Sequence, residues 1–225
     1  MSYTLFGTNV SPFVRKCRVY MAEKGLAYTH EPVNPFQPPP NFRQISPLGK
    51  IPALLDGERA IFDSTAICIY LERCNPAQPL FPSDHYDYAH ALCLEEYIDS
   101  GLMPVAGPLV FRPLVLGPVA MQQPLTKEIK EAALEVVENQ VAPMWDYLER
   151  QLGGNEYFVG NKLSIADIAV ASGHVNLWHG GVDPDPLHWP KLAAFLTRLW
   201  ARPSFVTLLA EEQKPWNRRA AVAAV

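Results

Sequence analysis

Residues 46–64, SPLGKIPALLDGERAIFDS, predict a loop, a short strand, a tight turn, a second strand and the first turn of a helix. The Asp-Gly pair at the centre of the stretch is typical of a hairpin turn. Pro52 stands at the entrance to the first strand, and Asp63 and Ser64 stand where the second strand meets the helix. Backbone groups at one place and an acid with a hydroxyl at the other favour a site for a small ligand resembling an amino acid.

The elements around this stretch predict a mixed α/β unit. Ser11 and Pro12 begin a helix with a hydroxyl cap and a proline at the first helical position. In that helix the apolar positions are expected to face inward and the basic positions Arg15, Lys16 and Arg18 outward. The expected elements are strand 3–6, helix 11–24, strand 27–33, a helical turn at 41–45, the hairpin, and helix 64–73. The order β-α-β-α-β-β-α predicts a mixed sheet with helices packed on it.

The remainder of the chain reads as all-α. Residues 101–124 carry repeated Pro and Gly, so any helix there is expected to break or kink. Asp167 completes a capping box and is interpreted as structural. The expected helices are 86–98, 125–152, 164–177, 191–200 and 204–212, and the predicted domains are 1–78, a proline-rich linker at 79–85, 86–215, and a loose tail at 216–225.

Composition excludes several classes of protein. The net charge of −4 argues against a nucleic-acid partner, which would need a basic face. The four cysteines and six histidines show no metal-binding spacing, so no metal is expected. The first residues do not form a signal peptide, and no apolar run is expected to reach bilayer length. Hydrolase and nucleotide-binding motifs are also missing. These features predict a soluble cytoplasmic protein without a membrane partner.

Four motifs, taken together, resemble the cytosolic glutathione transferases over nearly the whole chain. They are SPFVRK at 11–16, GKIPAL at 49–54, DSTAI at 63–67 and LSIAD at 163–167. The order and separation of the motifs are specific, and the chain looks most like the serine-type, phi-like or a related bacterial class. The resemblance implies a thioredoxin-like N-terminal domain, an all-α C-terminal domain, glutathione as co-substrate with no further cofactor, a homodimer, and a role in detoxification.

The glutathione site implied by the resemblance comprises Lys50, Ile51, Pro52, Asp63 and Ser64. A carboxylate of the γ-glutamyl end would lie at the helix N-terminus near Ser64, and Asp63 would pair with the ammonium group. In folds of this kind the proline is cis, which would turn the Ile51 backbone toward a peptide ligand. The plainer alternatives are that Ser64 only caps the helix, that Pro52 only ends a strand, and that Lys50 is simply solvated.

Ser11 is the expected catalytic residue. A capping serine accepts a hydrogen bond and keeps its own O–H free to donate to a bound thiolate. Lowering a thiol pKa by about two units needs about 2.7 kcal/mol. A hydrogen bond to a charged group supplies about 1.5–3 kcal/mol, and a helix N-terminus about 0.3–1 kcal/mol. Thr8 and Asn9 remain possible helpers. Redox relatives have cysteine at this position, so thiol–disulfide exchange is not expected.

The second substrate is expected where the helical domain faces Ser11. The candidates for its apolar wall are Phe13, Met103, Phe111, His174 and Trp178, although aromatic side chains in helical domains are more often core. The sequence thus predicts a glutathione transferase that conjugates the thiolate to an apolar electrophile, with peroxidase activity as a second reaction. The alternative is a non-catalytic binding or assembly module with the same fold.

Overall fold

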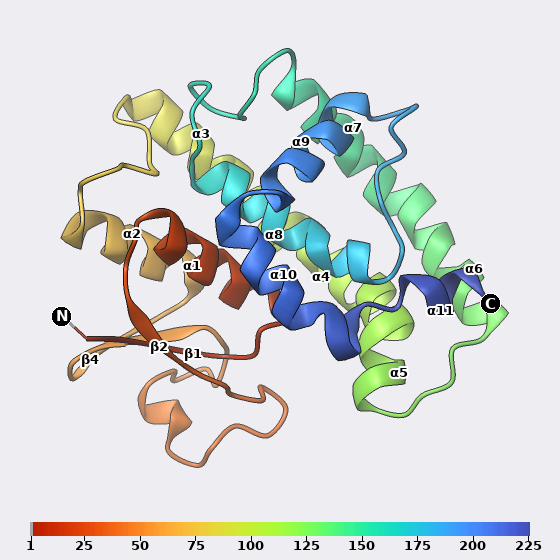
Figure 1. Ribbon diagram of the computed structural model, residues 1–225, viewed down its shortest axis with the longest axis horizontal. Coiled ribbons are helices and arrows are strands. Elements are labelled where there is room, and N and C mark those ends of the chain that lie inside the picture. The colour runs from red at the N-terminus through yellow and green to blue at the C-terminus, as the bar shows by residue number, and fades with distance from the viewer. Residues whose placement is uncertain (1) are drawn as a thin grey trace.

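The computed structural model describes residues 2–225, with a small sheet at one side and helices filling the rest (Figure 1). The first half follows the predicted order closely, each element beginning or ending within three residues of its expected limits. Its elements are β1 Tyr3–Phe6, α1 Pro12–Glu23, β2 Tyr28–Glu31, the 3-10 turn η1 Phe42–Gln44, β3 Ala53–Asp56, β4 Arg59–Phe62 and α2 Ser64–Cys74.

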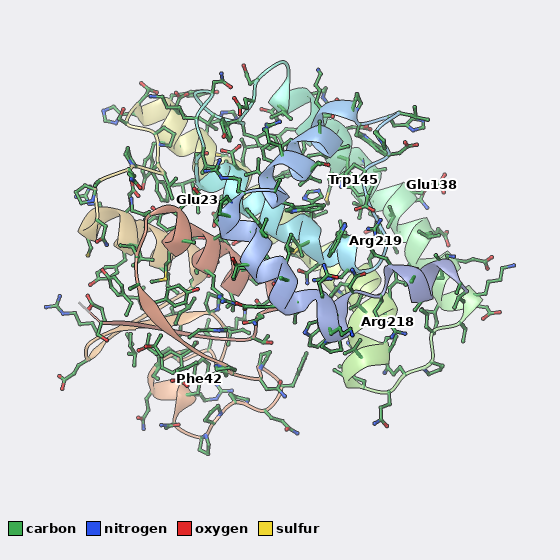
Figure 2. The ribbon with its side chains drawn as sticks, viewed as in Figure 1. Glu23, Phe42, Glu138, Trp145, Arg218 and Arg219 are labelled. Carbon is green, nitrogen blue, oxygen red and sulfur yellow. The ribbon has the colours of Figure 1, made fainter. Side chains whose placement is uncertain are left out.

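The sheet has the strand order β2-β1-β3-β4. Strand β1 runs parallel to β2 and antiparallel to β3, and β3 forms the hairpin with β4. The predicted mixed sheet is therefore confirmed. One face packs under α1 and α2, and Phe42 with its neighbours covers a smaller apolar cluster on the other face (Figure 2).

The second half is helical, as predicted. Its elements are α3 His85–Glu96, η2 Tyr97–Leu102, α4 Met103–Ala106, η3 Gly107–Leu116, α5 Gly117–Ala120, α6 Lys127–Val136, η4 Val137–Val141, α7 Ala142–Leu152, α8 Ile165–His179, α9 Pro190–Trp200, α10 Pro203–Trp216 and α11 Arg219–Ala223. The capping box of α8 is present, because both oxygens of the buried Asp167 carboxylate accept hydrogen bonds from the segment before the helix.

A break or kink was expected within residues 101–124, and the helix does end there, at Ala120. Before that point no break occurs, because helical backbone continues from His85 to Ala120. The stretches η2 and η3 are π-helical, and three of the prolines fall in the first two positions of a new segment. In a π-helical turn the backbone hydrogen bonds are spaced differently from those of an α-helix, so a proline, which has no N–H to donate, is accommodated here without ending the helix. The same run holds an 18-residue window that is apolar enough to span a bilayer by length and composition, with 44% of the window buried, so the expectation of no such run is also corrected.

The largest correction concerns α1. Arg15, Lys16 and Arg18 are buried, at 0%, 1% and 8% exposure, whereas outward exposure was expected. Figure 1 shows why, because α1 lies between the sheet on one side and α8 with α10 on the other. Each basic side chain meets an acidic residue of the helical half. The polar face of α1 is thus an interface between the two halves of the molecule.

One continuous apolar core joins the two halves. It extends from Leu5 on β1 through α1 to Phe205 on α10 and Val222 on α11. The predicted loose tail is therefore wrong, since α11 buries Val222 and the Arg218 amide donates to the His179 carbonyl at 2.8 Å. The division of the chain at residues 79–85 stays a prediction, because the two halves share this core.

Candidate functional site

A pocket of about 460 Å³ opens where the sheet half meets the helical half. Four separate segments of chain form it: the start of α1, the loop before β3, the end of β4 with the start of α2, and the end of α3 with η2. Its lining residues are Phe13, Ser46, Leu48, Lys50, Ile51, Pro52, Phe62, Asp63, Ser64, Thr65, Glu96, Asp99 and Ser100. All five residues predicted for glutathione binding therefore line one pocket, which the sequence alone could only suggest.

The loop before β3 contributes backbone to this pocket. The Ile51–Pro52 peptide bond is cis, as the resemblance implied. The register of β3 with β1 begins at Ala53, so the Ile51 backbone lies beyond the paired ladder and beside the pocket. The Ser46 hydroxyl donates to the Lys50 carbonyl at 2.7 Å and stabilises the loop, while Lys50 itself is exposed. An extended peptide ligand could pair with backbone in this position.

The junction of β4 and α2 holds an acid at the helix start. The Asp63 carboxylate accepts from the Thr65 amide at 2.9 Å, and Asp63 has φ +75°. Asp63 therefore caps α2, and the interpretation of Ser64 as the cap is wrong. Ser64 is instead the first helical residue, buried at 2% exposure. An anion at this helix start would meet unpaired amides and the positive end of the dipole.

Acidic side chains of the helical half form the opposite wall, and the sequence analysis missed them. The Ser64 hydroxyl donates to Asp99 Oδ2 at 3.4 Å. The same oxygen lies 2.5 Å from Lys16 Nζ, which also pairs with buried Glu95. Glu96 lines the pocket next to Asp99. These acids fall in an ordinary amphipathic helix, so the only sequence signal was the cluster of acids at residues 95–99.

Burial sets the ionisation of this wall. Desolvation raises the pKa of the Asp99 carboxyl to about 6, although Lys16 opposes the shift. Burial alone would lower the pKa of Lys16, but the Asp99 and Glu95 carboxylates outweigh that effect and raise it. Lys16 is therefore a permanent cation, whereas Asp99 changes charge close to neutral pH.

Ser11 lies at the N-terminus of α1, two residues before the pocket-lining Phe13. Its hydroxyl oxygen accepts from the Val14 amide at 3.4 Å, so Ser11 caps the helix as expected. Ser11 is half-buried and is not among the residues that line the 460 Å³ pocket. The potential helper Asn9 has its side chain bonded to Glu211 and Arg18, which directs it toward the helical half.

Gly7 explains how these segments come so close. A Cβ atom at Gly7 would lie 2.4 Å from Val14 Cγ2 and 3.2 Å from Ile51 Cβ. The residue has φ +146°, a backbone conformation that side chains disfavour. Only glycine lets β1, the start of α1 and the cis-proline loop meet at this point.

The five candidates for the second-substrate wall are not brought together. Phe13 lines the pocket, but Met103 and Phe111 are buried in the helical core. His174, on α8, is buried against Trp145. The Trp145 indole N–H donates to His174 Nε2 at 3.0 Å. Burial lowers the pKa of His174 to about 4, so the ring is a neutral core group. The prediction that His174 forms part of the second-substrate wall is therefore wrong.

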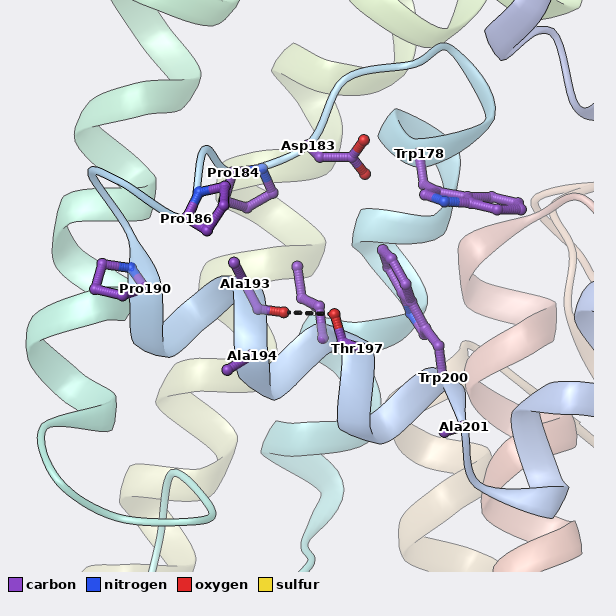
Figure 3. Close-up of a pocket in the computed structure, with 11 residues that line it drawn as sticks. Trp178, Asp183, Pro184, Pro186, Pro190, Ala193, Ala194, Thr197, Trp200 and Ala201 are labelled. Carbon is purple, nitrogen blue, oxygen red and sulfur yellow. Dashed lines mark hydrogen bonds between the residues drawn. The ribbon is translucent and has the colours of Figure 1, made fainter.

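Trp178 lies in a separate, larger groove of about 730 Å³ on the helical half (Figure 3). The ring centroids of Trp178 and Trp200 lie 6.0 Å apart. Pro184 and Pro186 line the groove from the loop between α8 and α9. Its only charged lining residue is Asp183, which already pairs with Arg219 at 2.6 Å. The lining of this groove is therefore mostly apolar, whereas the 460 Å³ pocket is lined by several charged and hydroxyl side chains.

Among the described residues 2–225, no group of three or more His, Cys, Asp or Glu side chains could hold a metal ion. The polar groups that line the 460 Å³ pocket are carboxylates, hydroxyls, Lys50 and the helix start.

Comparison with known proteins agrees with this geometry. Residues 5–79 match the family profile of the glutathione S-transferase N-terminal domain, and residues 102–203 match that of the C-terminal domain. The chain is 32% identical to glutathione S-transferase 3 of Zea mays over 172 residues, covering 72% of each chain. It is 29% identical to glutathione S-transferase Z2 of Arabidopsis thaliana over 211 residues, covering 90% of this chain and 88% of that one.

Solved structures show the same fold. A glutathione S-transferase from Rhodospirillum rubrum F11 superposes with a TM-score of 0.84 at 24% identity, covering 98% of this chain and 99% of that one. The two matched domains occur in the family's order, and the residues of the four sequence motifs occupy the helix starts and the cis-proline loop described above. The chain belongs to the cytosolic glutathione transferase family.

Proposed function

We propose that the protein binds glutathione in the 460 Å³ pocket and transfers its thiolate sulfur to an apolar electrophile. The observation that carries the proposal is the convergence of the Ile51–Pro52 backbone with Asp63 and Ser64 in one pocket. Glutathione is a tripeptide whose backbone can pair with the Ile51 backbone. Its first residue carries both an ammonium and a carboxylate group, which match Asp63 and the helix start at Ser64.

The γ-glutamyl end would lie at the start of α2. Its carboxylate would bind the amides and hydroxyl at Ser64, because the helix dipole favours an anion there. Its ammonium group would lie between Asp63 and Asp99, which line the pocket from the two halves of the molecule. The cysteinyl backbone would pair with Ile51, and Lys50 would meet the glycyl carboxylate.

The cysteinyl sulfur would then extend toward the start of α1. Ser11 would donate its O–H to the thiolate while its oxygen still caps the helix. The half-buried position of Ser11 leaves it accessible, and the 3.4 Å cap bond is a weak competitor for the hydroxyl.

The chemistry needs no covalent enzyme intermediate. In conjugation, the thiolate forms a carbon–sulfur bond and the leaving group departs with its electron pair. With a hydroperoxide, the sulfur takes one oxygen, the O–O bond breaks and an alcohol is released; a second glutathione then gives the disulfide and water. Positioning and thiolate stabilisation supply the rate enhancement. By analogy with the family, we propose that the chain works as a homodimer, which light scattering would test.

A calorimetric titration with glutathione tests the proposal. Wild type should bind glutathione stoichiometrically, and S-methylglutathione should bind with similar affinity, because the γ-glutamyl end supplies most contacts. A glutathione analogue lacking the γ-glutamyl amino group should bind at least tenfold more weakly. No detectable binding of glutathione at millimolar concentration would contradict the proposal.

The second candidate is a binding or assembly module of the same fold. The observation that favours it is that Ser11 does not line the 460 Å³ pocket. Glutathione binding without any change in thiolate ionisation would support that alternative.

A further inference from the structure

The loop that precedes Ser11 is tied to the helical half of the molecule. The Val10 carbonyl accepts from Asn176 Nδ2 at 3.2 Å and from the Arg15 guanidinium at 3.4 Å. Val10 and Asn176 are buried, at 6% and 4% exposure. Asn176 lies on α8, 166 positions along the chain from Val10. The peptide that leads into Ser11 is thus anchored by a side chain from the other half of the molecule.

Asn176 is itself held in one orientation. Its Oδ1 accepts from Arg15 at 2.9 Å, so the Nδ2 donor must face Val10. Arg15 is fully buried and bridges to Glu212 on α10 at 2.5 Å and to the Ser172 carbonyl at 2.7 Å. Each nitrogen of the Arg15 guanidinium has a hydrogen-bond partner in this buried network, and loss of one buried partner disturbs its neighbours.

The adjacent residue provides a second anchor. Asn9 donates to Glu211 on α10 at 3.0 Å and accepts from Arg18 at 2.9 Å. Arg18 in turn pairs with Glu211 at 2.7 Å. Consecutive residues of the β1–α1 loop are therefore bonded to α8 and α10, so the helical half determines where this loop lies.

The anchor bears directly on Ser11 because a peptide unit is planar. The Val10 carbonyl and the Ser11 amide belong to the same rigid plane, so fixing one orients the other. We propose that Asn176 is a positioning residue for Ser11, holding the Val10–Ser11 peptide so that the serine hydroxyl meets the glutathione sulfur. This rests on the proposed function, and it adds that the thiolate site is completed by α8 although both substrate-binding loops belong to the sheet half.

The test compares variants of Asn176 with a control variant. The control breaks a different polar contact between α1 and the helical half. Asn176→Asp keeps an oxygen for Arg15 but replaces the donor to Val10 with an acceptor. The control, Arg202→Gln, breaks the pair with Glu23 at the far end of α1, which lies at 2.7 Å. Asn176→Ala serves as a second variant in case the added carboxylate prevents folding.

The readout is the pH titration of the bound glutathione thiolate by difference absorbance, together with steady-state kinetics. Asn176→Asp and Asn176→Ala should raise the thiolate pKa by about one unit and lower kcat about fivefold near pH 6.5, with KM for glutathione within about twofold of wild type. Arg202→Gln should leave the thiolate pKa unchanged. An unchanged thiolate pKa in both Asn176 variants, with wild-type titration normal, would overturn the proposal while leaving the proposed function standing.

A measurement without glutathione separates the two claims further. Hydrogen exchange at the Ser11 amide should be about tenfold faster in Asn176→Asp than in wild type or Arg202→Gln. If wild type binds no glutathione, the proposed function fails, and exchange at Ser11 then decides whether Asn176 holds the loop. Equal exchange in all three proteins would overturn the positioning role.

Discussion

Lys16 on α1 lies 2.5 Å from Asp99, and the same Asp99 oxygen accepts from the Ser64 hydroxyl at 3.4 Å. One carboxylate therefore joins the interface between the halves to the pocket wall. Glu95 completes the cluster, since it pairs with Lys16 and accepts from Thr65 at 2.5 Å. The same charged side chains therefore lie in the interface between the two halves and beside the pocket.

Removing the cation of this cluster should be strongly destabilising. In Lys16→Met, Glu95 and Asp99 would be buried without their counter-ion, which costs about 3–5 kcal/mol. The matched control is Lys127→Met, because Lys127 pairs with Glu131 on the surface at 3.6 Å and such pairs contribute less than about 1 kcal/mol. Urea denaturation measures both, and equal stability of the two variants would contradict the role of Lys16.

Glutathione affinity should fall as the solution is acidified through pH 6. The pKa of Asp99 is raised to about 6, so below that pH the carboxyl becomes neutral and loses its attraction for the ammonium group. With one such group, affinity falls about tenfold between pH 7 and pH 5, while the α-carboxyl groups of glutathione stay ionised. The ligand for this test is S-methylglutathione, which has no thiol to titrate. Asp99→Asn should bind it more weakly than wild type at pH 7 and show no fall in affinity through pH 6. A fall of equal size in that variant would show that another group is responsible.

Asp63 combines a structural and a binding role that substitution can separate. Asp63→Asn keeps a capping oxygen for Thr65 and tolerates φ +75°, but it removes the charge. Its free energy of unfolding should stay within about 0.5 kcal/mol of wild type, while glutathione affinity falls about tenfold or more.

Asp63→Ala should lose binding and also about 1 kcal/mol of stability, since alanine cannot cap α2. Calorimetric titration and thermal unfolding of both variants check this. Wild-type affinity in Asp63→Asn would show that the ammonium group does not bind there.

Gly7→Ala should disturb the site through packing alone. Its Cβ would overlap Val14 Cγ2 at 2.4 Å, so α1 or the Ile51 loop must shift, at a cost of about 2–4 kcal/mol. Gly57→Ala is the control, because φ there is +59° with nothing within 4 Å of the new atom, and only backbone strain of about 1 kcal/mol remains. Equal unfolding free energies for the two variants would remove the packing argument.

The sheet half could be predicted because its signals are local. The capping serine and proline of α1, the Asp-Gly turn and the Asp63–Ser64 helix start each determine structure within a few residues. Lys50, Ile51, Pro52, Asp63 and Ser64 were predicted as pocket residues with the help of the family resemblance, whereas Ser46, Leu48, Phe62 and Thr65 were not. The alternative in which Ser64 caps α2 was wrong, because Asp63 is the cap, and either residue type can cap a helix.

The interface could not be predicted, because its partners are distant in sequence. Arg15 and Lys16 resemble an ordinary solvated face until Glu212 and Asp99 are brought against them in the fold. Asp99 and Asn176 were missed for the same reason. The continuity of the helix through residues 101–120 was not predicted, because Pro and Gly disfavour an α-helix, whereas most of this run is π-helical.

A pH titration of bound glutathione, followed by difference absorbance, measures whether Ser11 stabilises the thiolate. In wild type the apparent thiol pKa should lie about two units below the value of about 8.5 for a free thiol. In Ser11→Ala it should return to within about half a unit of the free value, because the charge-assisted hydrogen bond is lost. Bound glutathione that titrates near 8.5 in wild type, or equally in both proteins, would contradict the account.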